Sequence, residues 1–181
     1  MITMINEILS ILYLLVPAYF ANMIPVIAKK IDFLNYPLDF GKKINGKRIL
    51  GTNKTFRGLF FGTLAGGLVF YIQKIAHIEG FRAFSYIEYT EFGVWFGFLI
   101  GFVTIVGDAL ESFVKRQLDK KPGKPWVPWD QLDFVIANFI VLSFIIDFSL
   151  VSIILTSIVV TLGDMVVQYS GYKLGMKDDF L

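Results

Sequence analysis

Five apolar segments constrain the fold of this chain more than any other feature of its sequence. They cover roughly residues 8–28, 58–76, 91–110, 133–148 and 150–172. A helix needs about 20 mostly apolar residues to cross the hydrocarbon core of a bilayer. Hydrophobic residues make up 55% of the 181 residues, a share that ordinary soluble domains do not carry. The sequence therefore predicts an all-α, polytopic membrane protein of about five transmembrane helices, folded as one domain over residues 1–181.

The segments differ in length and in small-residue content. The fourth is short, and we expect it to form a hairpin with the fifth around residues 147–149. The first lacks a basic leader and a small-residue cleavage site, so we expect it to be retained as a helix. Glycine recurs every fourth residue in the second and third, at Gly58, Gly62 and Gly66 and at Gly93, Gly97 and Gly101. Such grooves let helix backbones approach closely, which favours one compact bundle. A homodimer through either groove stays open as an alternative.

Lysine and arginine are distributed unevenly between the connections. Fifteen of the 17 lie in residues 29–57, in residues 115–124 or in the C-terminal tail, and only Lys74 and Arg82 lie on the opposite side. Cytoplasmic loops of membrane proteins are enriched in these two residue types. The sequence therefore predicts a multi-pass protein of the cell membrane, with two large cytoplasmic loops, a cytoplasmic C-terminus and the N-terminus outside.

Charged residues gather at the facing ends of the third and fourth segments. A helix over residues 108–116 carries on one face Asp108, Glu111, Ser112 and Lys115. Asp130 and Asp133 are also three residues apart, at the start of the next apolar run. Two converging sets of carboxylates suit a hard divalent cation, while Lys115 and Arg116 suit phosphate oxygens. The alternative is that charges at helix ends only mark the lipid–water boundary.

A second polar group, at residues 48–58, directly precedes the second apolar segment. Backbone N–H groups at a helix N-terminus attract anions, and Lys54 and Arg57 add positive charge there. The spacing is not that of a Walker A loop. Asn53 and Thr55 are not needed for membrane orientation, so their presence favours a phosphate site. The alternative is a basic loop that only sets orientation or contacts anionic lipid.

Other polar residues exclude some sites and suggest others. The chain has no cysteine and a single histidine, so it has neither a disulfide framework nor a thiolate or multi-histidine metal site. Asn22 stands between Pro17 and Pro25, where interrupted backbone must be satisfied by protein or by a water-filled cavity. Asp164 lies within the last apolar segment, with Gln168 on its face. Two roles for Asp164 stay open: it is either a functional residue or the ion-pair partner of a cation in a loop.

Short motifs along nearly the whole chain carry a family resemblance. They are Pro17-Ala18-Tyr19 with Ala21-Asn22 and Pro25; Pro37 with Asp39-Phe40-Gly41; Arg48-Ile49-Leu50-Gly51 with residues 53–58; Gly107-Asp108; Ser112-Phe113 with Lys115-Arg116; Asp130-Gln131-Leu132-Asp133; and Tyr172-Lys173-Leu174-Gly175. In this order they resemble the archaeal CDP-archaeol synthases, membrane cytidylyltransferases related to the CDP-diacylglycerol synthases. Bacterial and eukaryotic relatives carry a His-Gly-Gly element and an Asp-Arg pair, and their replacement by Pro128-Trp129 and Asp130-Gln131 favours the archaeal branch.

The resemblance implies a Mg²⁺-dependent transfer of CMP from CTP to 2,3-di-O-geranylgeranyl-sn-glycerol 1-phosphate, an isoprenoid ether lipid. The products would be CDP-archaeol and pyrophosphate. The residues expected to be catalytic are Asp108, Lys115, Arg116, Asp130 and Asp133, of which the metal ligands are Asp108, Asp130 and Asp133. The residues expected to bind the nucleotide are Asn53, Lys54, Thr55, Arg57, Ser112, Lys115 and Arg116. We expect CTP to arrive from the cytoplasm, the lipid to arrive from the bilayer through a groove between helices, and no nucleic acid to bind.

Three alternative interpretations stay open. Another CDP-lipid enzyme, such as a CDP-diacylglycerol synthase, would use the same kind of site. A CDP-alcohol phosphotransferase would need the pattern D-G-x-x-A-R…G-x-x-x-D-x-x-x-D, whereas Asp130 and Asp133 are three residues apart. A small transporter or channel would use the acids as a permeation path, but most charges lie in loops and only Asp164 lies clearly at membrane depth.

Overall fold

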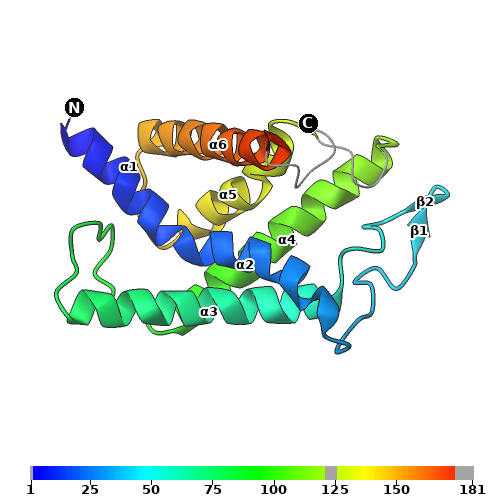
Figure 1. Ribbon diagram of the computed structural model, residues 1–181, viewed down its shortest axis with the longest axis horizontal. Coiled ribbons are helices and arrows are strands. Elements are labelled where there is room, and N and C mark those ends of the chain that lie inside the picture. The colour runs from blue at the N-terminus through cyan, green and yellow to red at the C-terminus, as the bar shows by residue number, and fades with distance from the viewer. Residues whose placement is uncertain (1, 121–125, 174–181) are drawn as a thin grey trace.

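The computed structural model describes residues 2–120 and 126–173, which form a bundle of helices with one small hairpin at its end (Figure 1). The helices are α1 (Ile2–Leu14), α2 (Val16–Ile27), α3 (Phe56–Ile78), α4 (Trp95–Gln117), α5 (Trp129–Leu142) and α6 (Leu150–Lys173). A short 3₁₀ turn, η1 (Ala28–Lys30), follows α2, and the strands β1 (Lys43–Ile44) and β2 (Lys47–Arg48) pair antiparallel. The fold confirms the all-α class. The expectations that concern Lys121, Lys124, Leu174, Gly175 and Lys177 lie outside the described residues.

Four stretches of helix in the described part of the chain are long and apolar enough to cross a membrane. They are Thr3–Lys30, Phe56–Ile78, Trp95–Gln117 and Leu150–Ser170. The first combines α1 and α2, which follow one another with a break only at Leu15. Pro17 lies in the first turn of α2, where its missing N–H removes no helical hydrogen bond. The protein is therefore a multi-pass membrane protein.

The predicted fourth span, residues 133–148, is wrong in its extent. Helix α5 begins at Trp129, ends at Leu142 and has 14 residues. At 1.5 Å per residue it covers about 21 Å, less than the roughly 30 Å of a hydrocarbon core. Turn hydrogen bonds continue to Ile146, whose N–H donates to the Leu142 carbonyl at 2.8 Å. Tertiary contacts follow: the Tyr86 hydroxyl donates to the Asp147 carbonyl at 3.0 Å, and the Tyr86 ring stacks on Phe148.

Contacts between connections define the two ends of the bundle. At one, which we call the hairpin end, the Lys47 ammonium donates to the Gln117 carbonyl at 2.8 Å. At the opposite end Tyr86 meets Asp147, and the Ser152 hydroxyl donates to Glu7 at 2.5 Å. Figure 1 shows the same division, with the hairpin and the end of α4 on the right and the N-terminus and the start of α6 on the left. The segment 129–149 thus begins at the hairpin end, where Asp130 pairs with Lys115, and reaches the opposite end at Asp147 despite its short helix.

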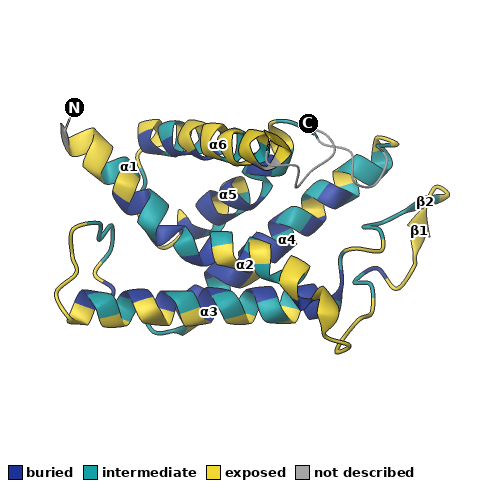
Figure 2. Cartoon of the chain, viewed as in Figure 1, coloured by how far each residue is buried: buried dark blue, intermediate teal, exposed yellow. Residues whose placement is uncertain are grey.

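Close packing of α3 against α4 depends on the glycines that the sequence singles out. A Cβ atom on Gly66 would lie 2.6 Å from the Gly97 carbonyl oxygen, and one on Gly101 would lie 2.8 Å from the Gly62 carbonyl oxygen. The grooves therefore serve contacts within the bundle, and the homodimer stays a prediction. Buried residues face inward on α2, α4 and α5, whereas the outer faces of α3 and α6 are exposed (Figure 2). Many of the exposed side chains are large and apolar, as expected of a surface that contacts lipid.

Candidate functional site

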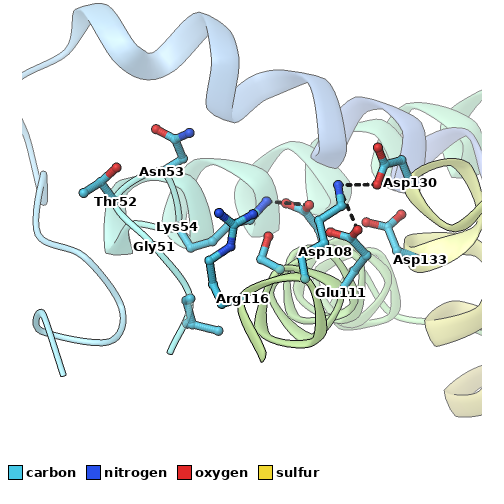
Figure 3. Close-up of a pocket in the computed structure, with 12 residues that line it drawn as sticks. Gly51, Thr52, Asn53, Lys54, Asp108, Glu111, Arg116, Asp130 and Asp133 are labelled. Atoms are coloured by element: carbon cyan, nitrogen blue, oxygen red, sulfur yellow. Dashed lines mark hydrogen bonds and ion pairs between the residues drawn. The ribbon is translucent and has the colours of Figure 1, made fainter. Parts of the chain in front are cut away.

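A polar cavity of about 280 Å³ opens at the hairpin end, between the loop before α3, the second half of α4 and the start of α5. We call it the charged cavity (Figure 3). Its lining residues are Leu50, Gly51, Thr52, Asn53, Lys54, Asp108, Glu111, Ser112, Lys115, Arg116, Asp130 and Asp133. It brings together all five residues predicted to be catalytic. Of the residues predicted to bind the nucleotide, only Thr55 and Arg57 lie outside its lining.

One buried carboxylate shapes the loop that forms the first wall. Asp39 is 5% exposed and accepts hydrogen bonds from the backbone N–H groups of Gly41, Leu50 and Gly51, at 2.9, 3.0 and 3.2 Å. Arg48 adds two more, at 2.8 and 3.2 Å. Burial by itself would raise the pKa of Asp39, but the bonds from Arg48 and from the three N–H groups hold that pKa well below its usual range. The charged carboxylate therefore fixes residues 50–51 beside α4.

The loop then runs into α3 through a short extended stretch. The Leu38 N–H donates to the Lys54 carbonyl at 2.8 Å, and the Phe56 N–H donates to the Tyr36 carbonyl at 3.0 Å. The Thr55 hydroxyl caps α3 by accepting from the Gly58 N–H at 3.2 Å. Thr55 therefore has a structural role at the helix start, and its predicted contact with nucleotide stays a prediction.

Arg57 faces away from the charged cavity. It is 7% exposed, and its Nη1 donates to the carbonyls of Lys29 and Ile31 at 3.3 and 2.8 Å, which ties the end of η1 to α3. It also lines a second polar cavity of about 680 Å³, which we call the neighbouring cavity. The residues lining that cavity are Asn22, Pro25, Val26, Lys29, Asn35, Thr52, Asn53, Lys54, Thr55, Arg57 and Asp108. Asn22, singled out in the sequence, thus contributes a polar group there.

Three carboxylates form a cluster in the wall between α4 and α5. One oxygen from each of Asp108, Glu111 and Asp133 lies within 4.8 Å of the other two. Asp108 and Glu111 are one helical turn apart on α4, and Asp133 joins them because Gly107 allows α5 to approach. A Cβ atom on Gly107 would lie 2.6 Å from the Ala137 Cβ and 2.9 Å from the Asp133 carbonyl oxygen. Oxygen ligands in this number suit Mg²⁺, which prefers carboxylates and keeps several waters.

This cluster differs in one member from the predicted metal ligands. Asp130 pairs with Lys115 and accepts from the Trp126 N–H at 2.8 Å, while Glu111 takes the third place beside Asp108 and Asp133. The spacing of Asp108 and Glu111 was the signal for Glu111, since residues three apart share a helix face. Asp130 as a metal ligand stays a prediction.

Basic side chains surround the cluster. Lys54 Nζ lies 2.5 Å from an oxygen of Asp108, and Lys115 Nζ lies 2.9 Å from Glu111 and also pairs with Asp130. These are the contacts drawn as dashed lines in Figure 3. Among the side chains that the structure describes, Arg116 Nε is buried without a hydrogen-bond partner. Other buried atoms share this state, but Arg116 is a cation in the lining of the charged cavity, and a phosphate oxygen bound there would offset the cost of the unpaired donor.

An apolar groove runs from the cluster along α4 and α5. Its volume is about 470 Å³, and its lining residues are Gly107, Leu110, Glu111, Val114, Trp126, Trp129, Asp133, Ile136, Ala137 and Ile140. Glu111 and Asp133 line both the groove and the charged cavity. A polar site and an apolar channel therefore meet at the carboxylate cluster.

Two other polar residues of the sequence lie apart from this site. Asp164 accepts a hydrogen bond from Gln168 at 2.5 Å on the same helix, and it is not among the described residues that line either polar cavity. His77 lies on the last turns of α3, toward the opposite end, within 2.9 Å of Ser85 and 2.7 Å of Glu88. The role of Asp164 stays open.

The fold and the site define a class: a multi-pass, α-helical membrane protein with a cluster of carboxylates and basic side chains in a polar cavity at one end of its bundle. The sequence profile of the CarS-like CDP-archaeol synthases matches residues 4–181, and the chain belongs to this family. The resemblance carried by the short motifs is thereby confirmed.

Individual members of the family are similar to this chain over most of their length. The CDP-archaeol synthase of Pyrobaculum calidifontis is 34% identical over 175 residues, which cover 96% of this chain and 98% of the relative. That of Methanocaldococcus jannaschii is 35% identical over 173 residues, 92% of this chain and 93% of the relative. A solved structure, described as an intramembrane enzyme for archaeal membrane lipid biosynthesis, is similar with a TM-score of 0.72 and 27% identity, over 88% of this chain and 93% of that one.

Proposed function

We propose that this protein is a CDP-archaeol synthase. It transfers CMP from CTP to the phosphate of 2,3-di-O-geranylgeranyl-sn-glycerol 1-phosphate, in the synthesis of archaeal membrane phospholipids. Family membership over nearly the whole chain supports the activity. The observation that carries the proposal is the sharing of Glu111 and Asp133 between a charged cavity and an apolar groove. A polar nucleotide and a lipid chain need such a junction in order to meet.

In the proposed reaction, an oxygen of the lipid phosphate attacks the α-phosphorus of CTP. The bond from that phosphorus to the oxygen bridging the α- and β-phosphates breaks, and pyrophosphate leaves. The attacking oxygen is already anionic, so the site needs no strong base. The task of the protein is to align two anions and offset their charge, as in other phosphoryl-group transfers.

Asp108, Glu111 and Asp133 would hold Mg²⁺. When bound, this ion neutralises phosphate charge and favours the in-line arrangement of attacking and leaving oxygens. Lys54, Lys115 and Arg116 supply further positive charge around the cluster, and the unpaired Nε of Arg116 is suited to a phosphate oxygen.

The groove between α4 and α5 is the proposed route for an isoprenoid chain of the acceptor lipid. Its middle is lined by aliphatic side chains, among them Leu110, Ile136 and Ile140, which are exposed on the surface of the bundle. The head of a lipid lying there would reach Asp133 and Glu111. The groove therefore supports entry of the lipid from the bilayer.

We further propose that the hairpin end faces the cytoplasm. Fifteen of the 17 lysines and arginines lie in segments assigned to that side, in agreement with the enrichment of cytoplasmic loops in these residues. CTP and the charged cavity would then share a compartment.

A direct assay tests the function. Protein purified in detergent is given Mg²⁺, CTP and the geranylgeranyl ether lipid phosphate, and pyrophosphate release is followed. Release should require both substrates and be accompanied by a CDP-lipid product. Preferential use of a diacyl phosphatidic acid would favour a CDP-diacylglycerol synthase. Absence of release with either lipid, at a protein concentration that binds CTP, would contradict the proposal.

A further inference from the structure

The two lysines beside the carboxylate cluster differ in the partners that they have. Lys54 has one ion-pair partner among the described residues, Asp108, which belongs to the cluster. Lys115 pairs with Glu111 in the cluster and also with Asp130 outside it. If every carboxylate of the cluster took another cation, Lys115 would keep a partner and Lys54 would have none.

A divalent cation and Lys54 compete for the same carboxylate. The ammonium lies 2.5 Å from one oxygen of Asp108, so a divalent cation bound by the same carboxylate would lie within a few ångströms of the ammonium and repel it. Mg²⁺ needs its ligand oxygens at about 2.0–2.1 Å in octahedral order. Binding of the ion at Asp108 therefore separates Lys54 from it.

The surroundings of Lys54 give the released ammonium a second destination. Its backbone is fixed, because its carbonyl accepts from the Leu38 N–H and its neighbour Thr55 is bridged to Pro37. Its side chain is 19% exposed and lines both the charged cavity and the neighbouring cavity. A rotation of the side chain alone brings the ammonium to an anion in either space.

We propose that Lys54 is a metal-gated phosphate ligand. It neutralises Asp108 until a divalent cation takes that carboxylate, and only then binds a phosphate of the nucleotide. The inference rests on the proposed function, since it names the order in which that site is assembled. Metal and nucleotide then strengthen each other's binding by the same factor, as linkage requires.

Binding measurements separate this role from that of a permanent phosphate ligand. The full-length protein and its Lys54→Met variant are compared by equilibrium dialysis of labelled CTP, once in EDTA and once in excess Mg²⁺. In EDTA the two should bind CTP equally, because Asp108 holds the wild-type lysine. In Mg²⁺ the variant should bind CTP roughly tenfold more weakly, the effect of one lost charge-assisted hydrogen bond.

The metal is also measured alone. Titration with Mn²⁺, followed by electron paramagnetic resonance without nucleotide, should give tighter binding to Lys54→Met than to wild type, because the competing ammonium is gone. Lys47→Met is the matched control, since Lys47 lies in the same loop and pairs with the exposed Asp119. It should change neither measurement. If Lys54→Met proves unstable in detergent, Lys54→Gln takes its place.

The outcomes decide between the two proposals. Equal loss of CTP binding in EDTA and in Mg²⁺ would make Lys54 a permanent ligand and overturn the gating, while pyrophosphate release by wild type would still support the function. If CTP binding in EDTA is too weak to measure, the Mn²⁺ titration decides, and unchanged or weaker metal binding by the variant overturns the inference. Failure of wild type to bind CTP under either condition would remove the proposed function itself.

Discussion

Asp39 and Asp133 illustrate two opposite uses of a carboxylate in one small protein. Every described hydrogen-bond donor to the Asp39 side chain belongs to the same loop as Asp39. Its negative charge therefore stabilises the conformation of that loop. Among the described residues, Asp133 accepts a hydrogen bond from the adjacent Phe134 N–H alone, at 2.6 Å, and its nearest charged neighbours include two other acids. The interactions of Asp39 stabilise the folded chain without a ligand, whereas the repulsion between Asp133 and its acidic neighbours is reduced when a cation binds.

Replacing Asp133 with Asn should abolish turnover without harming the fold. The change keeps the shape of the side chain but removes charge from the carboxylate cluster, so Mg²⁺ binds more weakly. Pyrophosphate release should fall by about a hundredfold or more, and the thermal midpoint in detergent should stay equal or rise as repulsion is relieved. Near-normal turnover would remove Asp133 from the site.

Glu111 and Asp130 form a matched pair for the identity of the third ligand. Glu111→Gln should weaken Mn²⁺ binding about as much as Asp108→Asn, because both carboxylates belong to the cluster. Asp130→Asn should leave Mn²⁺ binding within about threefold of wild type and act on CTP instead, because it removes one of the two carboxylate partners of Lys115. The reverse order of effects would restore Asp130 to the metal site in place of Glu111.

Asp39→Asn should destabilise the loop that carries residues 50–54. Because the pKa of Asp39 is lowered on folding, its charge stabilises the protein fully above the unfolded pKa of about 3.9, and this contribution is lost only in stronger acid. The variant should therefore unfold several degrees below wild type by the same margin at pH 5 and at pH 8, as read by differential scanning fluorimetry. A margin that changes between these two pH values would point to another group.

At the scale of helices, the length of an apolar segment predicts that a helix is present, and it predicts the ends of that helix where they depend on nearby residues. The predicted span over 58–76 falls within α3, and the first predicted span covers most of the α1–α2 pair. The span over 91–110 overlaps α4, but that helix begins at Trp95 and continues to Gln117. The fourth span was predicted to reach residue 148, whereas α5 ends at Leu142 and residues 147–148 contact Tyr86, some sixty positions away, which the sequence alone does not reveal. The hairpin of β1 and β2 has no apolar pattern and was also missed.

Gly107 offers a test of how helix packing supports the site. Gly107→Ala places a methyl group against Ala137 and the Asp133 backbone, so α5 must move and the carboxylate cluster must widen. We expect at least a tenfold loss of pyrophosphate release and weaker Mn²⁺ binding, since metal sites tolerate little displacement. Gly163→Ala is the control, because its Cβ would meet nothing within 4 Å, and it should leave both unchanged. Equal behaviour of the two variants would contradict the packing argument.

At the scale of the whole molecule, the sequence predicts the composition of the site better than its geometry. Helical spacing on α4 and the start of the next run identify all five residues expected to be catalytic, and each lines the charged cavity. Spacing could not reveal that Arg57 turns toward η1, because that contact joins segments that meet only in the fold. The cap by Thr55 is local, since its hydroxyl accepts from the Gly58 N–H three residues on, and it was missed although threonine is a preferred residue at helix N-caps. The sharing of residues between cavity and groove is likewise a tertiary property.

Membrane orientation is testable because the chain has no cysteine. Single cysteines at the exposed positions Lys43, Glu79 and Asp147 report to an impermeant thiol reagent. Lys43→Cys should label only from the cytoplasmic side, and Glu79→Cys and Asp147→Cys only from outside. The third variant also tests whether the segment of α5 crosses the membrane despite its short helix. Labelling of Lys43→Cys and Asp147→Cys from the same side would contradict that crossing.

The junction of groove and cavity also determines how products can depart. Pyrophosphate, formed on the wet side of Glu111 and Asp133, can diffuse into the aqueous phase, while a lipid whose chain lies along α5 can slide sideways into the leaflet. Pyrophosphate need not enter the bilayer and the lipid product need not enter water, so a turnover requires no extraction of lipid into the aqueous phase. An enzyme built this way would work as a phase-transfer catalyst, and its rate in vesicles should follow the surface density of acceptor lipid rather than its bulk concentration.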